Sequence, residues 1–451
     1  MGGGSLQLTA LGPQDIYLTG NPQITFFKSV YKRHTNFSIE TIPLTFKDDI
    51  DFGNTNRVCI IERNGDLVGP MYLNVTLPEL KQEQTHNGQT STYVSWIEGI
   101  GNALIKSVEL EIGEYRIDKH FGEWLDIWGE LNVTSENQAG YDKMVGNRYT
   151  SDDMDPEEAV EAHPLTLQIP LRFWFNNHPG LALPINALQY HQVRLIFEFE
   201  DLKNLVRSDI DLGDNPKDIT GSTAKITDCI LLVDYYYLSS DEQRIFSQVA
   251  HEYIIEQLQF NSFENLEVNQ KNKNIDIDFF KNPVKYLVWV IQDKTYLTTE
   301  TGISTTDTYR KASGNQKLRY SSLANINGDF NTFKSAVLKI NNNDRIKERE
   351  ADYFRLVQNM QFFKKVPRKY IYTYSFCLKP NEPQPSGSAN MSKVDFELDL
   401  EFDTTTVSEN FKSTGGNYTG QTQNEIEVKI YAVNYNILKI VGGQAGLSYN
   451  V

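Results

Sequence analysis

The sequence predicts an all-β protein built from two tandem copies of one β-sandwich, with short accessory helices. Most apolar stretches are short and alternate polar and apolar residues with a period of two, as half-buried strands do. Clusters of Gly, Pro, Asn and Asp separate these stretches, a spacing typical of sandwiches. The stretches also recur in the same order roughly 200 residues later, which indicates an internal duplication.

The stretch KVDFELDLEFD is the clearest predicted strand. Its apolar face carries Val394, Phe396, Leu398, Leu400 and Phe402, and its acidic face carries Asp395, Glu397, Asp399, Glu401 and Asp403. We therefore expect one buried face and one wet face. Further strands are predicted at FSIETIPLTF, MYLNVTL, SVELEI, PLRFWF, VRLIFEFE, CILLVDYYYL, VKYLVWVI, AVLKI, YIYTYSF and EIEVKIYAVNYNILKI.

The duplication is visible in four pairs of stretches. VELEIGEYRID resembles AVLKINNNDRIK, because each has a strand, a tight polar turn and an Arg-Ile pair, so that Arg116 corresponds to Arg345. PLRFWFNNHPGLALP resembles YIYTYSFCLKPNEPQPSG, QVRLIFEFE matches KVDFELDLE, and LVDYYYL matches AVNYNIL. A repeat this long indicates two copies of one domain and not a short-period solenoid.

An amphipathic helix is predicted after each Arg-Ile hairpin. Apolar residues recur at i, i+3, i+4 and i+7, which is the spacing of one helix face. In the first copy they are Phe121, Trp124, Leu125 and Trp128, and in the second they are Tyr353, Leu356, Val357 and Met360.

A short linker helix is predicted between the two copies, within SSDEQRIFSQVAHEYIIEQLQF. Ser239 with Glu242, or Ser240 with Gln243, has the spacing of a capping box. The predicted organisation is an N-terminal arm at 1–23, a first sandwich at 24–239, a linker helix at 240–250 and a second sandwich at 251–451. Polar segments at 201–224, 295–330 and 403–424 are expected to be long exposed loops.

The segment GNPQITFFKSVYKRHTNF concentrates cations and aromatic residues near the start of the chain. Asn21 is a favoured N-cap residue and Pro22 a favoured first helical residue. Lys32 and Arg33 would lie at the C-terminal end, where cations complement the helix dipole. We therefore expect a short helix with a broad aromatic face, and not a nucleic-acid grip, since only Lys28 supplies a cation before that end.

Composition excludes several classes of function. A formal net charge of -16 argues against a protein that coats duplex DNA, because such proteins neutralise phosphates with basic stripes or tails. The three cysteines, Cys59, Cys229 and Cys377, show no metal spacing and are expected to be buried, reduced thiols. No secretory signal is recognisable, and no apolar run reaches the roughly 18 residues of a membrane span.

No catalytic, cofactor-binding or metal-binding residue is predicted, and no cofactor. The sequence contains no P-loop, GxGxxG, HExxH or G-x-S-x-G motif. His251 in HEYII lacks the second histidine of a zinc helix and is interpreted as the start of a strand. The acidic row at 395–403 could bind a hard cation or supply glycosidase carboxylates, but a solvated or inter-subunit strand face is favoured. Trp124, Trp128 and Trp174 could line a sugar groove, but their periodicity favours the core.

Several motifs resemble the major capsid proteins of nucleocytoplasmic large DNA viruses, of the phycodnavirus and iridovirus-like branch. They are LTALGPQDIYLTGNPQITFFKSVYKRHTNFSIE, RNGDLV, VELEIGEYRIDKH, PGLALPINALQYHQVRL, HEYIIEQLQF, QPSGSANMSKVD and YAVNYNILKIVGGQAGLSY. The resemblance follows nearly the whole chain in the same order and departs mainly in the long polar loops.

This resemblance implies two eight-stranded jelly rolls in each chain, a double jelly roll. It further implies a homotrimer of pseudo-hexagonal outline that tiles, with neighbouring capsomers, the icosahedral shell of a large double-stranded DNA virus. Minor capsid and penton proteins are the implied partners, with the N-terminal arm at the capsomer base near an internal membrane. No direct contact with nucleic acid is expected, and assembly is expected in the host cytoplasm.

Two alternatives stay open from the sequence. Clustered aromatic residues and carboxylates also suit a β-sandwich that binds or cleaves carbohydrate. A paralogous minor capsid or scaffold protein would have the same fold.

Overall fold

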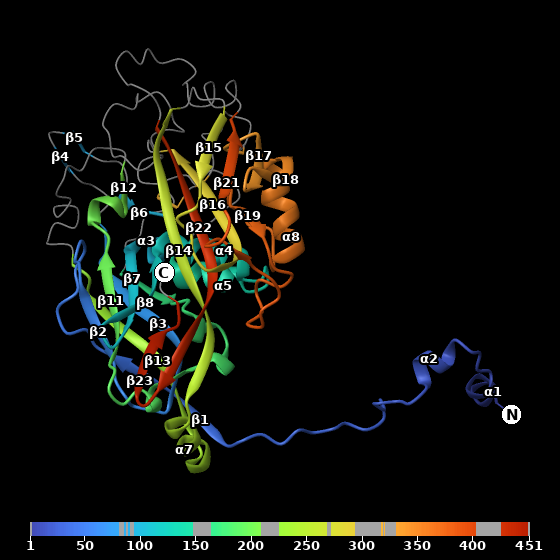
Figure 1. The fold of residues 1–451 in the computed structure, drawn as a ribbon. Coiled ribbons are helices and arrows are strands. Elements are labelled where there is room, and N and C mark those ends of the chain that lie inside the picture. The colour runs from blue at the N-terminus through green and yellow to red at the C-terminus, as the bar shows by residue number, and fades with distance from the viewer. Residues whose placement is uncertain are drawn as a thin grey trace. The chain divides into compact units, whose positions relative to one another are not determined.

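The computed structural model describes residues 2–80, 85–86, 89–90, 94–147, 164–208, 225–267, 272–293, 317–318, 320, 331–402 and 425–449 (Figure 1). The long polar segments predicted at 201–224, 295–330 and 403–424 lie largely outside these ranges. The chain divides into two compact units, Met1–Phe37 and Ser38–Val451. We call the first the N-terminal unit and the second the body.

The N-terminal unit contains two short helices, α1 (Gly3–Thr9) and α2 (Asp15–Thr19). The helix predicted from Asn21 to His34 is wrong, because residues 21–36 contain only two bends and a turn. Asn21 has a φ of 49°, in the left-handed region and not in the extended region of an N-cap. An isolated helix this short is marginal in water, and Phe27 is 98% exposed, so no packing stabilises a helical face here.

Eight strands form the first jelly roll. They are β1 (Phe37–Leu44), β2 (Arg57–Ile61), β3 (Leu67–Leu77), β7 (Ile105–Ile112), β8 (Tyr115–Phe121), β9 (Leu165–Pro170), β11 (Val193–Phe199) and β13 (Asp228–Leu238). One sheet has the order β1-β13-β3-β9 and the other the order β2-β11-β7-β8. In strand β11 the residues alternate strictly between the core and the outer face. A strand places successive side chains on opposite faces, so this alternating sequence buries its apolar residues only as a strand.

The second jelly roll repeats this topology strand for strand. Its strands are β14 (His251–Glu267), β15 (Asn272–Asp276), β16 (Pro283–Asp293), β17 (Ser335–Ile340), β18 (Asn343–Glu350), β19 (Tyr372–Ser375), β21 (Phe396–Glu401) and β22 (Glu425–Val441). The sheets are β14-β22-β16-β19 and β15-β21-β17-β18. In both copies the first strand pairs with the eighth and the second with the seventh, which confirms the duplicated all-β fold.

Shorter elements complete the body. The strands are β4 (Thr85–His86), β5 (Gln89–Thr90), β6 (Val94–Trp96), β10 (Leu183–Pro184), β12 (Val206–Ser208), β20 (Ala389–Asn390) and β23 (Gln444–Leu447). The helices are α3 (Ile100–Leu104), α4 (Gly122–Asn132), α5 (Gln138–Val145), α6 (Trp174–Asn177), η2 (Pro179–Leu181), η3 (Ile185–Ala187), η4 (Leu202–Asn204), α7 (Ser240–Gln248), η7 (Tyr353–Val357) and α8 (Gln358–Phe362).

The predicted strand PLRFWF is only partly correct, because β9 ends at Pro170. The chain instead turns into α6 around Asn176. The Asn176 side-chain Oδ1 accepts a hydrogen bond from the Phe173 backbone N–H at 3.0 Å, and its Nδ2 donates to the Gly69 carbonyl at 2.9 Å. An asparagine that bonds locally to the backbone competes with the strand ladder and favours a turn.

The two jelly rolls have separate cores that share long strands. Strands β14 and β22 pair over most of their length and run side by side through the body (Figure 1). Their far ends place Ile255, Leu438 and Ile440 in the core of the first jelly roll. In the same core, burial raises the pKa of the Cys59 thiol to about 12, and Cys59, Cys229 and Cys377 are all free thiols.

Helix α7 occupies the position of the predicted linker helix, with Ser239 as its N-cap residue. The Ser239 side chain makes no capping hydrogen bond. Gln243 instead donates from Nε2 to Asp66 Oδ1 at 2.7 Å, and the Leu238 backbone N–H donates to Asp66 Oδ2 at 2.9 Å. The carboxylate of Asp66, in the RNGDLV motif, therefore holds the end of β13 and the start of the connection to the second jelly roll.

Asp66→Ala should lower the free energy of unfolding by about 3 kcal/mol, because two hydrogen bonds to a buried carboxylate are lost. Urea denaturation followed by tryptophan fluorescence measures the change. Asp49→Ala is the matched control, since Asp49 is exposed and should cost under about 0.5 kcal/mol. Equal stability of the two variants would contradict the role given to Asp66.

Candidate functional site

The candidate sites of the sequence analysis do not assemble into a catalytic centre. Among the described residues, no group of three or more His, Cys, Asp or Glu could hold a metal ion. His251 begins β14, and its Nε2 lies 2.8 Å from the Phe246 carbonyl oxygen, as expected for a strand-start histidine. Trp124 and Trp174 are buried, and Trp128 is half-buried under the Arg172 guanidinium, 4.0 Å from the ring centre. These rings are therefore part of the packing and form no open sugar platform.

The acidic row on β21 is an ion-paired strand face. Asp399 pairs with Lys339, and Glu401 pairs with Lys334 at 3.3 Å and accepts a hydrogen bond from Ser335. Asp403, the last member of the predicted row, lies outside the described residues. Cross-strand pairs of opposite charge stabilise a sheet, so Asp399 and Glu401 contribute to the stability of this one.

The main cluster of charged side chains in the body lies where the two jelly rolls meet. We call this cluster the ionic seam. Its acids come from the first jelly roll: Glu123, Asp126 and Glu130 of α4, Asp142 of α5, and Glu200 after β11. Its bases come from the second: Lys317, Lys365, Arg368, Lys369 and Lys429. In the described parts of the chain, every ion pair across the seam follows this segregation.

Arginine 368 forms the centre of the seam. Its guanidinium donates to Glu130 Oε1 at 2.6 Å and to Asp142 Oδ2 at 2.9 Å, and its backbone N–H donates to Glu130 Oε2 at 3.0 Å. Such forked, charge-assisted bonds fix orientation as well as distance. The seam is therefore a geometric constraint on the angle between the jelly rolls.

Two more ion pairs flank this centre. Lys369 donates to Asp126 Oδ2 at 2.7 Å, and both side chains are almost fully buried. Lys429 donates to Glu123 Oε1 at 2.7 Å, and the Tyr431 hydroxyl donates to Glu123 Oε2 at 3.0 Å. Helix α4 thus rests on the outer face of the sheet β14-β22-β16-β19.

Electrostatics at the seam differ from one carboxylate to the next. Burial acts to raise the pKa of Glu130, but hydrogen bonds from Arg368 and the charges of Lys369 and Lys365 outweigh it and lower the pKa. At Asp126 burial dominates, and the pKa is raised despite the attraction of Lys369. Glu130 is therefore a carboxylate whose ionisation the seam stabilises.

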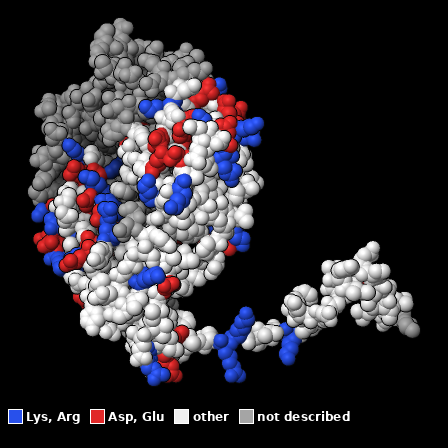
Figure 2. Space-filling view, viewed as in Figure 1, with Lys and Arg blue, Asp and Glu red and all other residues white. Residues whose placement is uncertain are grey.

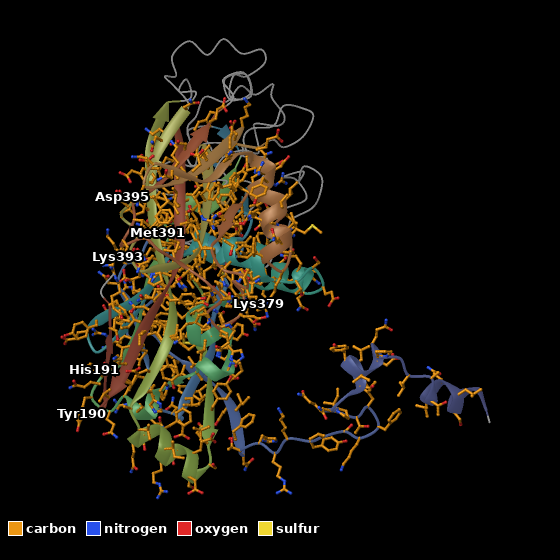
Figure 3. The ribbon with its side chains drawn as sticks, turned by 45° about the vertical axis from the view of Figure 1, so that its right-hand side comes forward. Tyr190, His191, Lys379, Met391, Lys393 and Asp395 are labelled. Atoms are coloured by element: carbon orange, nitrogen blue, oxygen red, sulfur yellow. The ribbon has the colours of Figure 1, made fainter. Side chains whose placement is uncertain are left out.

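Sequence motifs that carry the family resemblance also fall at joins between elements. Tyr190 and His191 lie beside the turn of the β22–β23 hairpin (Figure 3). The Tyr190 backbone N–H donates to the Gly443 carbonyl at 3.0 Å, and the Ala445 N–H donates to His191 Nδ1 at 3.1 Å. These contacts attach the C-terminal hairpin to the first jelly roll.

The motif QPSGSANMSKVD closes one edge of the second jelly roll. Met391 is buried in its core, and β20 pairs with the start of β16. At Asp395, the backbone N–H donates to Asn341 Oδ1 at 2.9 Å, which ties the motif to the β17–β18 turn. Figure 3 shows Met391, Lys393 and Asp395 close together along this edge.

The predicted second amphipathic helix exists, but its apolar stripe faces outward. It spans η7 and α8, and Phe354, Gln358 and Asn359 form its buried side. Leu356 and Met360 are 39% and 81% exposed. The prediction assumed the 3.6-residue period of an α-helix. The π-helical turn at η7 has a longer period, so it rotates the apolar residues away from the predicted buried side.

The sequence analysis missed the ionic seam. Its partners lie more than 100 positions apart along the chain, and Asp126 and Lys369 lie 243 apart. Two local signals were present: acids at i, i+3 and i+7 of the helix at 122–132, and the cationic run KKVPRK at 364–369. Neither signal identifies the other as its partner.

Two similar jelly rolls joined by a buried ionic seam define the fold class of this protein as a double jelly roll. Among the described helices, none is long and apolar enough to cross a membrane.

Comparisons with known proteins agree with this class. A family model described as "Major capsid protein N-terminus" matches residues 25–239, and one described as "Large eukaryotic DNA virus major capsid protein" matches residues 242–446. The major capsid protein of Pyramimonas orientalis virus is 39% identical, and that of Paramecium bursaria Chlorella virus 1 is 35% identical, each over 100% of both chains.

Solved structures give the same result. A chain of the PBCV-1 virus capsid superposes with a TM-score of 0.74 at 30% identity, covering 95% of this chain and 100% of that one. The Faustovirus major capsid protein superposes with a TM-score of 0.68 at 13% identity, covering 96% and 94%, and shows the shared fold alone. The chain therefore belongs to the family of major capsid proteins of large eukaryotic DNA viruses. It is a structural protein of the virion shell and not an enzyme.

Glu130→Gln should destabilise the body by about 3 kcal/mol at pH 7, because buried cations lose a partner. The pKa of Glu130 lies below its usual 4.5 in the folded state. Its stabilisation is therefore complete above about pH 4.5 and is lost as the pH falls through the lowered pKa. Urea unfolding between pH 3 and 7 should show the gap between variant and wild type narrowing below pH 4.5.

The exposed pair of Glu252 with Lys439 supplies the control for this experiment. Glu252→Gln should change the free energy of unfolding by under about 1 kcal/mol at pH 7. A gap between Glu130→Gln and wild type that is independent of pH would contradict the assigned ionisation.

Proposed function

We propose that the protein is the principal shell subunit of its virus and acts as a homotrimer of pseudo-hexagonal outline. The observation that carries this proposal is the duplication, since three chains with two similar jelly rolls present six similar lobes. Six lobes around a threefold axis pack on a hexagonal lattice, so many trimers can tile an icosahedral shell. The domain organisation proposed for this unit is the one predicted from the sequence, 1–23, 24–239, 240–250 and 251–451.

The N-terminal unit supports a role at the base of the capsomer. Its apolar side chains have no core of their own: Phe26, Phe27 and Tyr31 are each about nine-tenths exposed. In Figure 2 the visible part of this unit shows Lys and Arg among uncharged residues, whereas acids and bases intermingle on the visible face of the body. Minor capsid proteins, penton proteins and an internal membrane surface are the proposed neighbours, with assembly in the host cytoplasm.

A paralogous minor capsid or scaffold protein is the remaining alternative, because it would share the fold. Abundance in purified virions separates the two, since a principal subunit should dominate the particle protein.

The purified protein should sediment as a particle of about three times 51.7 kDa and show a six-lobed outline by electron microscopy. A monomer at micromolar concentration, with no larger species, would contradict the proposal.

Deletion of residues 1–33 should leave the unfolding midpoint of the body unchanged and impair assembly of trimers or shells. The reason is that the N-terminal unit contributes no buried residue within 2–33. Sedimentation velocity measures assembly, and the double variant Phe26→Ser with Phe27→Ser tests the aromatic contribution without shortening the chain. A deletion variant that assembles normally would refute the role of this unit.

A further inference from the structure

The second jelly roll presents an apolar helix face with no partner in the described chain. The face consists of Leu356, Val357 and Met360 at the junction of η7 and α8, and Met360 alone is 81% exposed. Adjacent exposed apolar side chains on one helix usually mark a contact with another molecule. We call this set the outer helix face.

The equivalent helix of the first jelly roll shows which kind of surface such a face contacts. Helix α4 follows β8 as η7 follows β18, and it lies on the outer face of the second jelly roll's sheet β14-β22-β16-β19. There the Trp124 ring lies 5.5 Å from the Tyr431 ring, and Glu123 bonds to Lys429. In this contact, the helix of one jelly roll therefore packs on the next jelly roll, against the sheet that contains its first, eighth, third and sixth strands.

Within the described residues, no further jelly roll covers the outer helix face. The same residues leave the matching sheet face of the first jelly roll, β1-β13-β3-β9, without a helix of this kind. On that face Ile230 and Leu232 of β13 are half-buried and pair in register with Asn74 and Tyr72 of β3. Within the described chain, Asn74 Oδ1 is buried without a hydrogen-bond partner.

We propose that the outer helix face binds the outer face of the sheet β1-β13-β3-β9 in a second copy of this chain. The interface repeats between chains the contact that α4 makes within a chain. This inference rests on the proposed trimeric function and names the surfaces that build it. Because the helix and the sheet are different surfaces, the contact is heterologous. A ring closes only when the helix of each copy binds one neighbour and its sheet binds the helix of the other neighbour.

The chemistry of the two contacts explains why the copies join in only one order. Within the chain, acids of α4 meet bases of the second jelly roll. Between chains, Leu356, Val357 and Met360 meet Ile230 and Leu232, apolar against apolar. Exchanging the partners would bury Glu123 and Asp126 against a sheet face whose outward strand residues include Asp228 and Asp234 and no cation, which is strongly unfavourable. The surfaces therefore specify alternation of first and second jelly rolls around the ring.

Two variants test the surfaces separately. Met360→Glu places a negative charge on the helix side and Leu232→Glu places a charge of the same sign on the sheet side, with Thr76→Glu, on the same sheet face, as a second sheet variant. Each should weaken trimer formation by roughly 100-fold or more, because an unpaired charge is buried on association. Leu378→Glu is the control, since Leu378 is 75% exposed and lies outside both faces. Circular dichroism and thermal midpoints confirm that each variant is folded.

Mixing gives the sharpest outcome. Analytical ultracentrifugation should show monomers for the helix variant and for the sheet variant alone, and a dimer that grows no further when they are mixed. One intact helix and one intact sheet remain in the mixture, so a single contact forms. Trimers in both single variants would overturn this interface while the proposed function stands, whereas a monomeric wild type would overturn the proposed function itself.

Discussion

The rest of the structure depends on the ionic seam that fixes one jelly roll against the other. A buried ion pair contributes little net stability, because desolvation offsets most of the attraction. Its effect is geometric: Arg368 reaches Glu130 and Asp142 together, and these bonds constrain the mutual orientation of the two jelly rolls. For a shell subunit, that orientation decides whether copies can close a ring.

The contact between a helix and a sheet is charged within a chain and, in our proposal, apolar between chains. Charged partners hold the jelly rolls of one chain together as the chain folds, since a charge left alone in the interior is costly. The proposed contact between chains is apolar and lacks such groups, so its surfaces can stand in water before the copies meet. Gene duplication gives two similar lobes, and the charged contact within a chain and the proposed apolar contact between chains give each lobe its own partner.

Much of the fold was predictable from the sequence, because strand periodicity and duplication are local or repeated signals. The alternation of polar and apolar residues alone predicts the strands in KVDFELDLEFD and EIEVKIYAVNYNILKI. The repeated order of the strands predicts the matched hairpins around Arg116 and Arg345. The helix expected at Asn21 failed because periodicity was present but no packing surface accompanied it. The seam could not be predicted, since pairing of Asp126 with Lys369 is decided by tertiary contact.

The most direct test of the account is the rotation that relates successive jelly rolls, measured by cryo-electron microscopy of the assembled trimer. If the contact between chains repeats the contact within a chain, both rotations should be about 60°, since three chains must close one turn. The helix of η7 and α8 should lie on the sheet β1-β13-β3-β9 of the next copy. Very unequal rotations, or a trimer in which Met360 faces solvent, would contradict the account.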